Sequence, residues 1–223
     1  MTLRLLASAL AVFASTPAAA QEQDFQAWFM GVAQGRVGGD LIVYAEVQPR
    51  ITDDASRLGQ LLLRPALGVQ LGARTSVLAG YAYVRTEPLG GTATDEHRFW
   101  QQVAWPVATV GRLTLTARTR LEQRTIEGAD DLGWRFRQQV RATFPVARAE
   151  GVAGVVWTEP FYNLNGTAWG QRAGFDQWRT FVGAALPVGG KVSLEPGYMN
   201  QTVFRRGEDR SNHIASLNLF YRF

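Results

Sequence analysis

The sequence predicts an all-β protein, an antiparallel up-and-down transmembrane β-barrel of about 10–12 strands. Apolar and polar residues alternate along several segments, short and long connections alternate between them, and apolar residues occupy every second position from Leu217 to Phe223. Alternation with a period of two is the β-strand pattern. Short turns on one rim and longer loops on the other are typical of bacterial outer-membrane barrels. Such barrels must close, because hydrocarbon offers no partner to a free backbone N–H or C=O.

The alternation is seen first in residues 41–51, where odd-numbered apolar residues oppose polar ones such as Glu46 and Arg50. Residues 60–71, 113–124, 134–144 and 215–223 repeat the pattern. Together with the segments between them, they predict eleven strands, centred near Met30, Tyr44, Leu63, Ala79, Val103, Ala117, Gln139, Val155, Val182, Glu195 and Leu217.

The connections and the strand count lead to different expectations. Short turns are predicted at residues 38–40, 72–74, 109–111, 148–150 and 189–190, and longer loops at 52–57, 87–96, 125–132, 163–174 and 205–212. Single-chain bacterial barrels have an even number of strands, whereas eleven is odd. We therefore expect either that residues 25–37 are split or lie partly outside the wall, or that one more strand is present, giving ten or twelve.

The first 20 residues are predicted to be a secretory signal peptide, followed by a barrel domain over residues 21–223. Arg4 supplies the positive charge, Leu5 to Ala14 form the apolar core, and three alanines at positions 18–20 precede Gln21. This pattern predicts export, and with the strand pattern it predicts a location in the bacterial outer membrane.

Composition excludes several classes of function. The chain has no cysteine and two histidines, so disulfide scaffolds, cysteine-ligated metal sites and multi-histidine centres are not expected, and no cofactor is predicted. The formal charge of +4 is too small and too scattered to indicate nucleic-acid binding.

A cluster of charged residues on the polar faces of the predicted strands is the strongest candidate site. We expect these residues to line the barrel interior: Arg64, Arg118, Arg120, Glu122, Arg124, Arg135, Arg137, Arg141, Glu159, Arg179 and Glu195. The favoured interpretation is a ladder of ion pairs that fills a narrow barrel, with Glu46, Glu159 and Glu195 as the partners of arginines on the hairpin of residues 113–144. The alternative is an anion-selective lumen.

The two faces of the strands distinguish a membrane barrel from a soluble one. For the membrane barrel we expect Arg118, Arg120, Arg135 and Arg137 to point inward and Leu113, Leu115, Phe136 and Val140 to point outward. Aromatic residues at strand ends are predicted to form girdles at the membrane interfaces: Trp28, Trp105, Trp134, Phe144, Trp178, Tyr221 and Phe223. In a soluble secreted barrel that binds a small apolar ligand the faces would be reversed.

Serine–histidine catalysis is the remaining alternative, as in an outer-membrane enzyme that modifies lipid. His213 and Ser216 lie three apart on one strand and so point to opposite faces, whereas Ser211 and His213 share a face but stand roughly 6–7 Å apart. His97 lies on a strand remote from the last one. No catalytic residue is therefore assigned.

Five short motifs resemble an uncharacterised bacterial family, known as domain of unknown function 2490. They are Arg120–Arg124 (RLEQR), Trp157–Asn165 (WTEPFYNLN), Phe175–Arg179 (FDQWR), Gly197–Gln201 (GYMNQ) and Asn212-His213. The resemblance implies an outer-membrane-like barrel with no assigned activity, and it carries no functional residues to this chain. Residues 217–223 separately resemble the terminal-strand signal of outer-membrane proteins, formed here by Leu217, Leu219, Tyr221 and Phe223.

The sequence therefore predicts an exported outer-membrane β-barrel of structural or pore-like role. Its expected partners are outer-membrane lipid and, through the C-terminal strand, the barrel-assembly machinery.

Overall fold

The computed structural model describes residues 22–146 and 151–223, and both of these segments are built from β-strands. The predicted signal peptide (residues 1–20) and the predicted turn at residues 148–150 lie outside the described residues. The strands are β1 (Glu22–Gly38), β2 (Leu41–Thr52), β3 (Arg57–Leu71), β4 (Thr75–Thr86), β5 (Thr94–Val110), β6 (Leu113–Ile126), β7 (Gly133–Pro145), β8 (Ala153–Asn163), β9 (Gly174–Gly189), β10 (Val192–Val203) and β11 (Arg210–Arg222).

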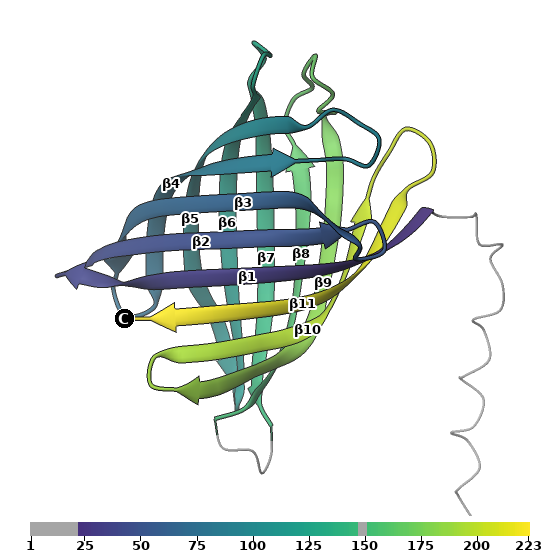
Figure 1. Ribbon diagram of the computed structural model, residues 1–223. Helices are drawn as coiled ribbons and strands as arrows, with labels where there is room; N and C mark the ends of the chain where they lie inside the picture. Colours follow the sequence, from purple (N-terminus) through teal and green to yellow (C-terminus); the bar gives the residue numbers. More distant parts are fainter. Residues whose placement is uncertain (1–21, 147–150) are drawn as a thin grey trace, which may run out of the picture.

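These eleven strands form one closed barrel, in which each strand pairs with its neighbours in sequence and β1 pairs with β11 (Figure 1). All hairpin pairs are antiparallel, but β1 and β11 run in the same direction, in register from Glu22 opposite Arg210 to Gln34 opposite Arg222. The all-β barrel prediction is thus confirmed.

The expectation of an even strand number is wrong for this chain. Residues 25–37 are neither split nor outside the wall, because they belong to β1, a strand of 17 residues. An odd number of alternating strands can close only if the first and last are parallel. A parallel ladder still pairs the backbone groups of both strands, so the wall has no free edge.

The connections divide the barrel into two rims. Two- or three-residue turns at 39–40, 72–74, 111–112 and 190–191 form what we call the turn rim, and residues 53–56, 87–93, 127–132, 164–173 and 204–209 form the loop rim. Gly39, Gly72, Gly111 and Gly190 have φ between 52° and 69°. Glycine adopts this left-handed conformation without steric cost, which explains why the short turns carry it.

The outer face of the barrel is apolar, and the inner face carries the charges. Phe136 and Val140 on β7 are exposed, whereas Arg135 and Arg137 between them are buried. The even-numbered residues of β6, such as Arg118 and Arg120, line the interior, so Leu113 and Leu115 face outward as predicted. This is the reverse of a soluble barrel, and it argues against an apolar-ligand carrier.

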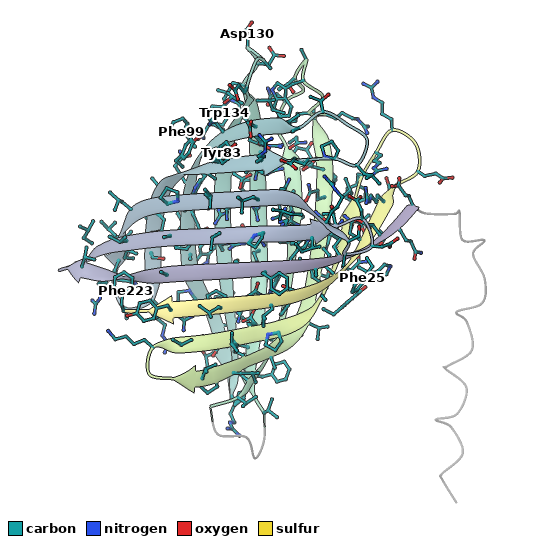
Figure 2. The ribbon with its side chains drawn as sticks, in the orientation of Figure 1. Phe25, Tyr83, Phe99, Asp130, Trp134 and Phe223 are labelled. Carbon is teal, nitrogen blue, oxygen red and sulfur yellow. The ribbon has the colours of Figure 1, made fainter. Side chains whose placement is uncertain are left out.

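Aromatic side chains occur near both ends of the outer face (Figure 2). Trp134 and Trp178 are exposed on strands that meet the loop rim, and Phe144, Tyr221 and Phe223 are exposed close to the turn rim. Trp105 is half-buried. Trp28 corrects the predicted girdle, because it is 3% exposed and lies inside the barrel. It shares its face of β1 with Gln26 and bonds that side chain through its indole N–H.

The interior also contains two apolar clusters, one on β1–β5 and the other on β1 and β8–β11. The first is formed by Val32, Ile42, Tyr44, Ala66, Leu78, Ala82 and Trp100, and the second by Trp28, Val155, Phe181, Met199 and Ile214. In the second cluster Phe181 stacks on Trp157, with ring centroids 5.3 Å apart. Glycine at 183 and 197 leaves room for this ring, because a Cβ at either position would lie within 2.5 Å of it.

Among the described residues, no helix is long and apolar enough to cross a membrane.

Candidate functional site

The barrel lumen of the described structure is a cavity with a volume of about 1270 Å³. Its lining extends from Asp53 and Glu87 at the loop rim to Thr143, Ser193 and Arg222 toward the turn rim. Side chains from all eleven strands contribute to it. The lumen is therefore the place where the polar faces of the strands meet.

A chain of ion pairs runs along the inner face of three adjacent strands, from β6 to β8. Glu122 accepts hydrogen bonds from Arg135 Nη2 at 2.6 Å and from Arg137 Nη1 at 2.8 Å. Arg137 also donates to Glu159 from Nη2 at 3.0 Å, and Arg118 Nη2 donates to the same carboxylate at 2.8 Å. Each of the two glutamates is at most 2% exposed. Positive and negative groups thus alternate through a buried network.

Three further glutamates each hold at least one arginine. Glu96 accepts two hydrogen bonds of 2.7 Å from Arg98 and one from Arg124. Glu195 on β10 binds Arg141 on β7, across strands that are not neighbours.

Glu46 departs from the sequence-based expectation. It binds Arg64 on the adjacent β3 at 2.6 Å, together with Tyr44, and it does not bind the arginines of the β6–β7 hairpin. Arg64 and Arg120 both lie near the first apolar cluster, where they approach the face of Trp100. The nearest carboxylate oxygen to Arg120 is that of Glu122, at 3.8 Å, and its main partner is the Gln102 side chain at 2.6 Å. Arg179 donates to Gln177 at 2.9 Å.

The structure therefore places all eleven candidate residues in the barrel interior, and it adds residues that the candidate set lacked. Glu96, Arg98 and Arg50 are buried there as well. Glu96 and Arg98 share their face of β5 with Gln102, so strand parity could have identified them. With these additions and Glu46, the interior holds ten arginines and five glutamates. The arginines are Arg50, Arg64, Arg98, Arg118, Arg120, Arg124, Arg135, Arg137, Arg141 and Arg179, and the glutamates are Glu46, Glu96, Glu122, Glu159 and Glu195.

The histidines lie apart from this lumen, on the outer face. His213 Nδ1 lies 2.6 Å from the Tyr198 hydroxyl, and His97 is hydrogen-bonded to Tyr81. Ser216 is buried on the inner face of β11, opposite to His213. Among the residues described by the structure, no group of three His, Asp or Glu side chains is placed to hold a metal ion.

Comparisons with known proteins match this barrel to a family of unknown function. A family model described as a protein of unknown function (DUF2490) matches residues 25–212. An uncharacterised protein of Methylorubrum extorquens is 40% identical over 224 aligned positions, covering 99% of this chain and 98% of that protein.

Two solved structures of OmpT from Vibrio cholerae also match. The protein expressed in the outer membrane aligns over 80% of this chain and 61% of its own length, and the trimer form folded in vitro over 77% and 58%. Both have a TM-score of 0.40 and 13% identity. This chain thus spans about three-fifths of the length of the OmpT chains.

Proposed function

We propose, from the premise that this chain belongs to the DUF2490 family of unknown function, that it is an outer-membrane β-barrel whose lumen is a narrow pore favouring anions. The observation that carries this proposal is the excess of arginine over glutamate along a cavity that is lined from one rim toward the other.

The outer-membrane location is supported by the distribution of apolar and charged residues. An arginine exposed to lipid at the membrane midplane costs about 2–4 kcal/mol, and here the mid-strand Arg120 and Arg137 are inside while Val140 and Val182 are outside. Outer-membrane lipid is then the partner of the outer face. In water the same face would expose an apolar surface far larger than is usual for a soluble monomer.

The pore is supported by the size and charge of the lumen. If the cavity of about 1270 Å³ is spread over a hydrocarbon thickness of ~30 Å, its mean cross-section is roughly 40 Å², equivalent to a width of about 7 Å. A hydrated small ion could pass at this width. Clustered arginine lowers the electrostatic barrier for anions and raises it for cations.

Planar-bilayer recording tests the proposal. The folded barrel should carry a steady current whose reversal potential in a KCl gradient shifts toward that of chloride. Replacing Arg118, which lines the cavity, by Gln should reduce this shift, whereas Arg74→Gln in the exposed turn after β3 should leave it unchanged. Absence of current from folded, membrane-inserted protein would contradict the pore.

A closed structural barrel is the second candidate, and the buried network of Glu122, Arg137 and Glu159 favours it. Such a network could block the lumen at mid-height. The same recordings separate the two candidates, because a closed barrel adds no conductance to the bilayer. A lipid-modifying enzyme has weaker support, because both histidines bond tyrosine hydroxyls.

A further inference from the structure

Two buried arginines of the lumen differ from the other eight in their partners. Arg50 and Arg179 are the two of the ten with no carboxylate oxygen within 4.0 Å among the described residues. Both are less than 10% exposed. Removing a charge from water without an opposite charge nearby is costly, so a buried guanidinium usually has a carboxylate or a bound anion beside it.

The partners that hold these two guanidinium groups are neutral amides. Arg50 donates from Nη1 to Gln60 at 2.5 Å and from Nη2 to Gln48 at 2.7 Å, and its Nε has no hydrogen-bond partner. Arg179 donates to Gln177, and the Gln201 side-chain amide lies 3.1 Å from its Nη2. Amide oxygens orient the guanidinium groups but do not neutralise them.

Trp28 brings the two groups together from opposite parts of the wall. The guanidinium carbon of Arg50 on β2 lies 3.8 Å from the centre of the Trp28 ring, and that of Arg179 on β9 lies 5.0 Å from it. Because both approach the same ring, they are no further apart than the sum of these two distances. Both line the lumen cavity, so a solute in the lumen can reach them.

We infer that Arg50 and Arg179 form a binding site for a small oxyanion with two negative charges, such as phosphate or a short dicarboxylate. Guanidinium groups bind carboxylate and phosphate oxygens through paired N–H donors, and two uncompensated positive charges match a dianion. This inference deepens the proposed pore by naming the class of anion that it holds, and it rests on access to the lumen.

The site is tested by calorimetric titration of the detergent-folded protein with sodium phosphate and, separately, with sodium succinate, at constant ionic strength set with chloride. The wild-type barrel should bind at least one of them saturably, and the two titrations distinguish phosphate from dicarboxylate. Arg50→Gln and Arg179→Gln should each weaken binding by about tenfold or more, because each removes charge-assisted hydrogen bonds. Arg74→Gln, in the exposed turn after β3, should retain the wild-type affinity.

Two results would overturn the inference: no saturable binding of either anion by the wild type, or equal affinity in all three variants. The first result is measured on the wild type, so it does not depend on whether the variants fold. Heat-modifiable migration of the variants on gels would establish that they are folded. Failure of the proposed pore can be told apart from failure of the anion site. Anion binding without conductance supports the site and contradicts the pore. Conductance without anion binding supports the pore and contradicts the site.

Discussion

At the scale of single residues, the interior is organised by a few carboxylates that each hold more than one arginine. Glu159 contacts Arg118 and Arg137, and Glu122 contacts Arg135 and Arg137. Because arginine remains charged at any pH that a protein tolerates, loss of one glutamate leaves two guanidinium groups with fewer opposite charges.

Glu159→Ala is therefore expected to destabilise the barrel. Removing one partner of a buried ion pair costs about 3–5 kcal/mol, since the remaining charge stays buried without compensation. Urea unfolding of the detergent-folded protein, followed by tryptophan fluorescence, would measure the change in the free energy of unfolding.

Glu87→Ala provides the matched control. Glu87 pairs with Arg85 at 2.7 Å, but the two side chains are 47% and 43% exposed, so the expected cost is about 0–1 kcal/mol. If Glu159→Ala cost as little as Glu87→Ala, the network around Glu159 would have to be hydrated rather than buried.

The inner or outer position of a side chain could be predicted from sequence where polar and apolar residues alternate along the strand. It could not be predicted where an apolar residue such as Trp28 occupies an inward position. Parity assigns Arg135 and Arg137 on β7 to the inner face, because they alternate with the outward-facing Trp134 and Phe136. Trp28 was misplaced because aromatic residues near strand ends are usually interfacial, whereas here the indole lies inside the barrel, where the guanidinium groups of Arg50 and Arg179 approach its ring. The identity of ion-pair partners depends on strand tilt and shear, which alternation does not encode.

At the scale of elements, the seam between β1 and β11 is the distinctive part of the wall. The backbone N–H of Phe223 donates to Gln34 O at 3.2 Å, just beyond the end of β11. Gly35 lies beneath this last residue, because a Cβ on Gly35 would stand 2.3 Å from the Phe223 carbonyl oxygen and 2.5 Å from its ring.

Gly35→Ala should therefore weaken the seam, by about 1–3 kcal/mol as is usual for overpacking. Gly38→Ala, in the same strand, is the control, since no atom lies within 4 Å of a Cβ there. The folded fraction on semi-native gels after refolding would be compared for the two variants. An equal folded fraction would show that the backbone around Phe223 shifts to accommodate the methyl group.

Deletion of Phe223 tests the predicted assembly signal. We expect less barrel in outer-membrane fractions, because recognition by the assembly machinery is predicted to involve Phe223 together with Tyr221, Leu219 and Leu217. Refolding of the purified variant in detergent should be reduced much less, since most of the register between β1 and β11 remains. Normal insertion of the deletion variant in cells would show that Phe223 is not part of the assembly signal.

At the scale of the whole molecule, the number of strands can be checked by a cross-link across the parallel seam. Ala27 and Ala215 are opposite each other in β1 and β11, and the chain has no cysteine of its own. Neighbouring strands lie about 5 Å apart, within the range of a disulfide. The Ala27→Cys, Ala215→Cys double variant should therefore form an intramolecular disulfide on oxidation.

The control pairs Ala33→Cys with Ala215→Cys. Ala33 is opposite Tyr221, six residues further along β1, which places it roughly 20 Å from Ala215. Cross-linking in the control, or none in the first variant, would support the even-numbered barrel that strand-count rules predict.

Most of the whole-molecule architecture was predictable because a barrel repeats one simple pattern. The period of two, the alternation of turn and loop lengths and the strand centres all follow from local sequence. The parallel closure could not be predicted from local sequence, because nothing within residues 22–38 indicates whether that strand pairs with β11 in parallel or lies outside the wall. That choice depends on contacts between the two ends of the chain.

The parallel closure also determines the sidedness of the protein. In an even-stranded barrel the wall begins and ends at the same rim, but here the odd number of strands places its two ends at opposite rims (Figure 1). In the proposed outer-membrane location, with the short turns facing the periplasm as is usual for such barrels, we expect Arg222 at the periplasmic surface and Glu22 at the cell exterior. In topology such a barrel would resemble a single-pass membrane protein, and we expect labels placed at Glu22 and at Arg222 to react with reagents applied from opposite compartments.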